Sequence, residues 1–169
     1  LAQLREKNAD TLLLTAVDSI AWLLNIRGED VPFNPLLLSY FLLHRNGQGT
    51  LFCFTQEFSP TLLEYSRAES VHVQDIQAVF SESLAAATFE GRVLLDPQTV
   101  PYGWVRLLSA RGIAWVEAAD SVQASKAIKN AEELAGMRTA HAMDGLALTR
   151  FLHRFDQQSM QGNYLDELQ

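Results

Sequence analysis

The strongest constraint on the fold is a change in hydrophobic pattern near residue 120 of this 169-residue chain. Before that point, short apolar runs alternate with segments of helical period, whereas residues 130–157 show no strand pattern. Strands separated by helices favour parallel pairing through right-handed crossovers. We therefore predict an α/β fold, in which a mixed, mostly parallel sheet is flanked by helices and followed by a long helix.

The elements of the first region follow from apolar runs and turn signals. The predicted strands cover residues 11–15, 36–43, 50–54, 70–73, 92–95 and 113–116. The predicted helices cover residues 18–24, capped by Asp18 or Ser19, and residues 60–66, 76–86 and 102–110. Asn46-Gly47 supplies the positive φ angles of a hairpin turn, so strands 36–43 and 50–54 should be antiparallel neighbours.

The later segment is typical of one long helix over residues 131–157 with an apolar stripe. Asn130 is a suitable N-cap, and Glu132 and Glu133 are well placed against the helix dipole. The stripe residues recur at helical spacing: Leu134, Met137, His141, Leu148, Leu152 and Phe155. Such a helix either folds back on the sheet or begins a second domain. We favour the second domain, because the helix is unusually long, and expect domains at 1–122 and 123–169.

Charge and composition exclude several classes of partner. The net charge is −7, from 20 acidic and 13 basic side chains, and no Lys or Arg cluster occurs. Nucleic acid and anionic membranes are therefore not expected as partners. No apolar stretch approaches the roughly 18 residues of a membrane helix, and we expect no signal peptide. The chain begins with Leu1 rather than Met, which we interpret as a piece of a longer protein.

The single cysteine, Cys53, lies in the apolar run 51–54. Without an intrachain partner it forms no disulfide, which favours a reducing compartment. We expect a buried strand thiol, because a nucleophilic cysteine requires a more polar and half-exposed setting.

No arrangement of residues predicts catalysis by this chain. His141 with Asp144 and His153 with Asp156 each share a helix face, but the two pairs lie about 18 Å apart along the axis. Two metals of one catalytic centre lie only about 4 Å apart. Nucleophile-elbow, dinucleotide-binding and P-loop motifs are also missing from the sequence. We therefore name no catalytic or metal-binding residue.

One polar loop, residues 25–35, is the best candidate for ligand contacts, because loops at the edge of an α/β sheet commonly bind ligands. Its candidate residues are Asn25, Arg27, Asp30 and Asn34. Arg27 could bind a carboxylate, or it could pair with Glu29 or Asp30 in an ordinary capped turn.

Two motifs in this chain resemble a known family. Residues 15–35 (TAVDSIAWLLNIRGEDVPFNP), followed by Ser39-Tyr40, resemble the middle domain of three-domain aminopeptidase P enzymes. These are Xaa-Pro aminopeptidases of the creatinase and prolidase superfamily. Residues 126–148 (KAIKNAEELAGMRTAHAMDGLAL) resemble the entry to the catalytic pita-bread domain of that family. The stretch from Gln56 to Ala119 matches in pattern only.

The resemblance implies a cytoplasmic metallopeptidase that removes the N-terminal residue preceding proline, usually with two manganese ions. Its metal ligands are two Asp, one His and two Glu in the pita-bread domain. Those positions lie beyond the second motif, so none can be assigned here. His141 matches a position on the entry helix without a ligand role.

Our main hypothesis is a non-catalytic fragment of a metal-dependent Xaa-Pro aminopeptidase, inactive alone, with an architectural and substrate-access role. Its expected partners are the remaining domains of the parent enzyme, proline-containing peptides as the parent's substrate, and a second copy in a homodimer. The alternative is a self-contained α/β module that binds a small molecule or peptide without catalysis. In that case helix 131–157 would pack on the sheet. A complete small metallohydrolase is a third hypothesis, which manganese-dependent cleavage by this chain would support.

Overall fold

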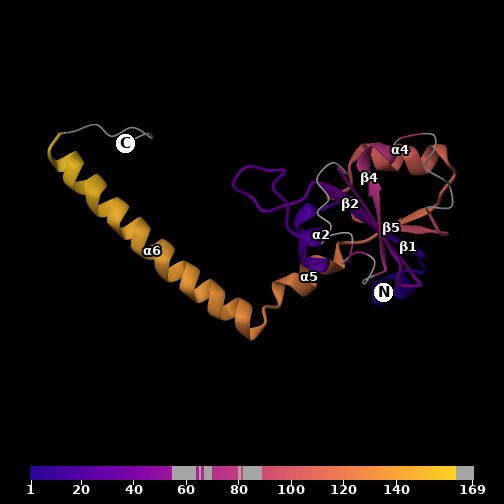
Figure 1. Cartoon of the computed structure of the whole chain (residues 1–169), viewed down its shortest axis with the longest axis horizontal. Helices are drawn as coiled ribbons and strands as arrows, with labels where there is room; N and C mark the ends of the chain where they lie inside the picture. The colour runs from indigo at the N-terminus through magenta and orange to yellow at the C-terminus, as the bar shows by residue number, and fades with distance from the viewer. Residues whose placement is uncertain (55–63, 65, 67–69, 80, 82–88, 163–169) are drawn as a thin grey trace. The chain divides into compact units, whose positions relative to one another are not determined.

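The structure, a computed structural model, describes residues 1–54, 64, 66, 70–79, 81 and 89–162 (Figure 1). The chain divides into two compact units, Leu1–Ala127 and Ile128–Gln169. Most of the predicted helix over 60–66 and most of the predicted helix over 76–86 lie outside the described residues.

A six-stranded sheet in the order β4-β3-β2-β1-β5-β6 forms the first unit, as far as it is described. Its strands are β1 (Thr11–Leu14), β2 (Ser39–His44), β3 (Gly49–Cys53), β4 (Val71–Asp75), β5 (Val93–Leu95) and β6 (Trp115–Glu117). The helices of this unit whose bounds the structure describes are α1 (Ala2–Glu6), α2 (Val17–Leu23), the 3-10 helix η2 (Ile76–Ala78), α4 (Tyr102–Ala110) and α5 (Ser121–Ala127).

Strand β2 alone runs against the other described strands. It pairs antiparallel with β1 and β3, whereas β1 with β5, β5 with β6 and β3 with β4 are parallel pairs. The carboxyl ends of the parallel strands therefore meet at one edge of the sheet. The predicted mixed, mostly parallel α/β sheet is confirmed.

The hairpin between β2 and β3 is also confirmed. Its turn places Gly47 at φ +91°, and the Gly47 amide donates to the His44 carbonyl at 2.9 Å. Strand β2 begins at Ser39 rather than Leu36, because the preceding backbone belongs to a loop. There the Leu38 amide donates to Asp30 and the Leu36 amide to the Asn34 carbonyl.

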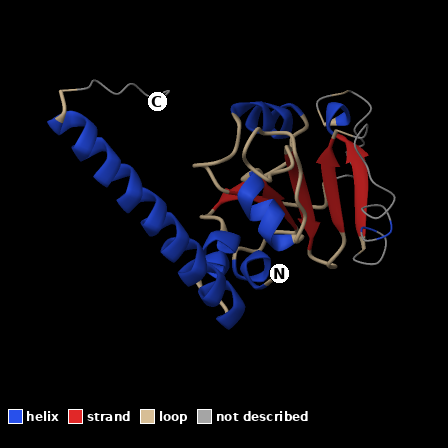
Figure 2. Ribbon diagram, turned by 60° about the vertical axis from the view of Figure 1, so that its left-hand side comes forward, coloured by secondary structure: helices blue, strands red, loops and turns tan. Residues whose placement is uncertain are grey.

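Helices cover both faces of the sheet (Figure 2). On one face, Leu4 of α1, Ile20 of α2 and Val122 of α5 share an apolar cluster with alternate strand residues. On the other face, Trp104 and Leu108 of α4 pack in a second cluster of strand residues. Burial on both faces explains why the central strands are continuous apolar runs.

One local prediction was wrong, and two short helices were missed. Helix α2 begins at Val17 with Ala16 as its N-cap and no side-chain cap, so neither Asp18 nor Ser19 caps it. Asp18 instead forms an ion pair with Lys126 of α5. Helices α1 and α5 were not predicted. The expected domains at 1–122 and 123–169 stay a prediction.

The second unit contains helix α6 (Ala131–Met160). Asn130 and Glu133 form a reciprocal capping box: the Glu133 amide donates to Asn130 Oδ1, and the Asn130 amide donates to Glu133 Oε2, each at 2.8 Å. The long helix and its N-cap are thus confirmed. Between residues 128 and 162, which are the described part of this unit, no other helix or strand could cover its apolar stripe.

Replacing Gly49 by alanine tests the packing of the hairpin. A Cβ atom at Gly49 would lie 2.5 Å from the Phe41 ring, and Phe41 is buried. Overpacking of this kind costs about 1–3 kcal/mol, so G49A should lower the free energy of unfolding in urea. In α6 nothing lies near a Cβ at Gly136, so G136A is the matched control and should not destabilise the chain. Equal urea midpoints for G49A and the unmodified chain would contradict this packing.

Candidate functional site

The loop over residues 25–38 lies at the carboxyl edge of the sheet. It leaves the end of α2 and enters β2, whose first residue, Ser39, pairs with Cys53 at the carboxyl end of β3. In open α/β sheets, ligands bind outside the carboxyl ends of the strands. The position of this loop therefore makes it the candidate site.

Asn25 ends helix α2. Its φ of +50° is left-handed, and its amide donates to the Trp22 carbonyl at 3.4 Å. The next amide, of Ile26, donates to the Ala21 carbonyl at 3.1 Å. This pair of bonds is a Schellman motif, in which asparagine tolerates the left-handed position. Asn25 thus sets the direction in which the loop leaves the helix.

Arg27 is bonded to the same helix end. Its Nη1 donates to the carbonyls of Ala21 at 3.2 Å and Ile26 at 2.8 Å. A cationic side chain at a helix C-terminus also complements the helix dipole. Within the described part of the chain, Arg27 pairs with neither Glu29 nor Asp30, and no bond uses its Nη2 or Nε.

The two limbs of the loop are held together. Asp30 Oδ2 accepts a hydrogen bond of 2.6 Å from the Leu38 amide. A Cβ atom at Gly28 would lie 2.8 Å from the Leu37 Cα, so only glycine allows this approach. At the tip, the Asn34 amide donates to the Val31 carbonyl at 3.0 Å. The four predicted site residues therefore share one closed loop, and each makes a local bond.

Sequence reasoning missed the apolar side chains of this edge. Phe33 at the loop tip is fully exposed, and Leu38 and Phe54 are 40% and 42% exposed. Leu38 and Phe54 precede and follow the paired residues Ser39 and Cys53, so they are neighbours at the edge of the sheet. The one signal for Phe33 was its position between Pro32 and Asn34, among the turn-forming residues of the loop.

Cys53 is a buried strand residue, as predicted. Desolvation by burial raises the pKa of its thiol to about 12, and the nearby Asp30 and Asp75 carboxylates add to this effect. A thiol with this pKa is not a nucleophile at neutral pH.

Acidic side chains at the same edge stabilise turns. Asp96 Oδ2 accepts from the Asp120 amide at 2.9 Å, and Asp120 Oδ1 accepts from the Val122 amide at 2.8 Å. The hydrogen bond from Lys126 is the main cause that lowers the pKa of Asp18. Among the residues that the structure describes, no group of three His, Cys, Asp or Glu side chains could hold a metal ion. No helix in this same portion is long and apolar enough to cross a membrane.

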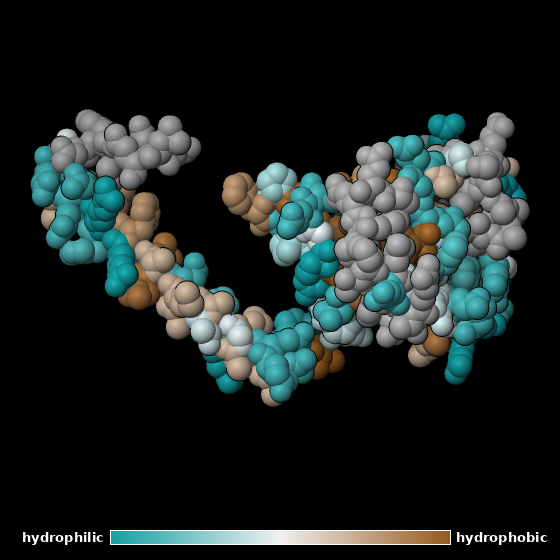
Figure 3. Space-filling model, viewed as in Figure 1, coloured by the Kyte–Doolittle hydropathy of each residue, from teal (hydrophilic) through white to brown (hydrophobic). Residues whose placement is uncertain are grey.

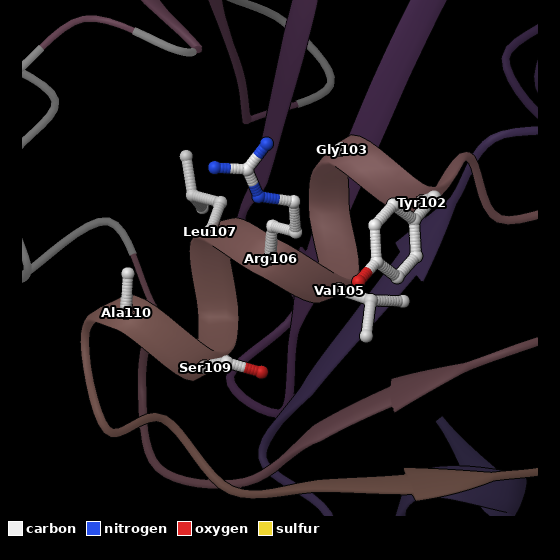
Figure 4. A pocket seen from close by; sticks show the side chains of 7 residues that line it. All are labelled: Tyr102, Gly103, Val105, Arg106, Leu107, Ser109 and Ala110. Carbon is white, nitrogen blue, oxygen red and sulfur yellow. The ribbon is translucent and has the colours of Figure 1, made fainter.

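A second surface feature is an open hollow over the exposed side of α4 (Figure 4). All the residues that line it belong to that one helix, and the side chains of Tyr102 and Arg106 point in different directions. They do not converge on a common point, so this hollow offers no site comparable to the loop.

The comparisons with known proteins agree with this fold. Residues 1–133 match the creatinase/prolidase N-terminal domain family. The Xaa-Pro aminopeptidase ApepP of Drosophila melanogaster is 31% identical over 169 residues, covering 98% of this chain and 27% of that protein. Xaa-Pro aminopeptidase 1 of Dictyostelium discoideum is 32% identical over 152 residues, covering 89% of this chain and 23% of that protein. This chain thus spans about a quarter of the length of these relatives.

Two solved structures share the architecture. The X-prolyl aminopeptidase of Caenorhabditis elegans, described as a cytosolic enzyme with a di-nuclear active site, superposes with a TM-score of 0.77 at 27% identity. That match covers 96% of this chain and 27% of the enzyme. The prolidase of Pyrococcus horikoshii has a TM-score of 0.60 at 16% identity, covering 88% of this chain and 39% of that enzyme, which is a likeness of fold alone.

Replacing Asp18 by asparagine tests the ion pair between α2 and α5. A carboxylate whose folded pKa is lowered stabilises the fold above its unfolded pKa, and this stabilisation is lost as pH falls through the folded pKa. Because the Asp18 side chain is 46% exposed, D18N should lower the free energy of unfolding at neutral pH by less than about 1 kcal/mol. The difference should vanish in acid. Urea unfolding at neutral and acidic pH checks this.

The control for D18N is E6Q, which removes the more exposed Glu6–Lys7 pair and should change little at either pH. A destabilisation by D18N that is equally large in acid would show that the charge of Asp18 is not its cause.

Proposed function

Because the chain belongs to the creatinase/prolidase N-terminal domain family, we propose that it is a non-catalytic middle domain of a longer Xaa-Pro aminopeptidase. One observation carries this proposal: Xaa-Pro aminopeptidases match nearly all of this chain, which spans only about a quarter of their length. The parent enzyme would remove the N-terminal residue that precedes proline, and its substrates would be proline-containing peptides.

We further propose that residues 123–169 form the linker and the first helix of the catalytic pita-bread domain. Helix α6 starts from its own capping box, and apolar residues from Leu134 to Phe155 recur along it at helical spacing. An amphipathic helix is stable when its apolar face is covered. In this proposal the following part of the parent enzyme covers it.

The metal centre of the parent enzyme would lie outside the residues described. The relative from C. elegans has a di-nuclear active site, and we propose two manganese ions for the parent. Within the described segments, carboxylates such as Asp96 and Asp120 bond to backbone amides and do not converge on a common point. This chain would therefore help to form the walls of the active site and would contribute no metal ligand.

The loop over residues 25–38 would border the substrate entrance. Its position at the carboxyl edge and its closed base favour this role, because a loop fixed before binding loses little conformational freedom on binding. Asn25, Asp30 and Asn34 hold its shape. Arg27 retains Nη2 and Nε toward a ligand, and a guanidinium binds a peptide carboxylate well. We also propose that the parent enzyme is cytosolic, as the C. elegans relative is described, and that it forms a homodimer.

The direct test of this function is an assay of the longer protein encoded with this chain. With manganese it should cleave an Xaa-Pro peptide and spare the same peptide with alanine in place of proline. The 169-residue chain alone should be inactive. A longer protein that binds manganese and leaves the Xaa-Pro peptide intact would refute the proposal.

Arg27→Ala in the longer enzyme tests the substrate loop. Loss of a charge-assisted hydrogen bond to the peptide should raise KM by about tenfold with a small change in kcat. Because Arg27 also caps α2, the melting temperature of each variant must be measured. E29A, which alters an exposed neighbour, is the control and should leave KM unchanged. A folded R27A enzyme with normal KM would contradict the role of Arg27.

A further inference from the structure

Phe33 combines two features that rarely occur together. Its exposure is 107% of the reference for a free residue, so no part of the described chain shields the ring. Its backbone φ is +62°, in the left-handed region that bulky residues seldom adopt. Singly exposed apolar residues are common, but strained conformations persist where function requires them and the surroundings enforce them. This combination makes Phe33 a candidate anchor.

The surroundings do enforce this conformation. The turn of residues 31–34 is closed by the bond from the Asn34 amide to the Val31 carbonyl. Below it, the Asp30–Leu38 bond and the contact of Gly28 with Leu37 join the two limbs. Pro32 fixes its own φ angle. The ring is therefore presented before any partner arrives, which reduces the entropy lost on binding.

The tip of the loop is apolar and uncharged. Residues 31–35 read Val-Pro-Phe-Asn-Pro and include no ionisable side chain. In the space-filling view, tan atoms stand at the outer end of the loop that projects beside α2, next to teal and pale groups (Figure 3). A tip of this composition fits a neutral apolar pocket and has no group that would pair with a charged one.

We propose that Phe33 inserts into an apolar pocket of the remaining part of the longer polypeptide and locks this domain against it. This inference rests on one part of the proposed function, namely that this chain belongs to a longer polypeptide. The relatives are about four times as long as the matched segment, so they provide such a partner on the same chain. A second copy of this chain is a less suitable partner. A stable dimer buries about 800 Å² on each partner, which is far more than one aromatic side chain supplies.

A contact within one polypeptide requires less area. Tethering raises the effective concentration of the pocket to about the millimolar range. One aromatic side chain can then remain bound for most of the time. The exposed Leu38 and Phe54 at the base of the loop would extend this contact along the edge of the sheet.

The test uses cysteine accessibility. In F33C, iodoacetamide should alkylate position 33 rapidly in the 169-residue chain and at least tenfold more slowly in the longer protein. Cys53 gives little background, because it is buried and its pKa is raised to about 12. Mass spectrometry of the peptide that contains position 33 assigns the reaction. A110C, at the exposed end of α4, is the control and should react equally in both proteins.

A second variant is needed, because F33C removes the aromatic ring and could itself weaken the proposed contact. F33A should lower the melting temperature of the longer protein and leave that of the 169-residue chain unchanged, and F33L should restore part of the loss. Equal alkylation of F33C in both proteins, or equal melting of F33A and the unmodified longer protein, would overturn the proposal. So would protection in the 169-residue chain that grows with its concentration, because a second copy would then be the occupant.

These outcomes separate the anchor from the proposed enzyme. A longer protein that cleaves Xaa-Pro peptides but leaves position 33 reactive would reject the anchor alone. One that protects position 33 but has no such activity would reject the enzyme alone.

Discussion

The reversed direction of β2 is the constraint on which the candidate site depends. The Asn46-Gly47 turn forces β2 to run against β3, and β2 also pairs antiparallel with β1. The chain must therefore enter β2 at the edge where the parallel strands end. That requirement brings residues 25–38 to the carboxyl edge, where α/β sheets bind ligands. With β2 parallel to its neighbours, the same loop would enter at the opposite edge.

The polar residues of the loop mostly maintain its shape. Asn25 terminates α2, Arg27 bonds to carbonyls at the same helix end, and Asp30 accepts from the Leu38 amide. A loop whose polar groups bond to its own backbone is stiff. The part that it exposes for contact with other surfaces is then mainly the apolar tip around Phe33. The domain would therefore act on its neighbours by shape and apolar contact rather than by chemistry of its own.

The sequence predicted those features that depend on local patterns. The Asn46-Gly47 turn and the Asn130 cap each rest on a few adjacent residues, and both were found as expected. Features that depend on long-range contacts were missed. Asp18 was taken for a cap, because its partner Lys126 lies far along the chain. The exposure of Phe33 was also missed, since it depends on how its loop closes, for example through the bond between Asp30 and the Leu38 amide.

Long-range contacts also hold helix α5, the last helix of the first unit. Helix α5 is short, and a helix of that length is marginal by itself. It persists because Val122 packs in the cluster that contains Ile20 and because Lys126 pairs with Asp18 at the start of α2. These two contacts fix the end of α5 against the helix that leads directly into loop 25–38. A change at Asp18 would then weaken the hold on α5 at the point of exit, although Asp18 lies on another helix.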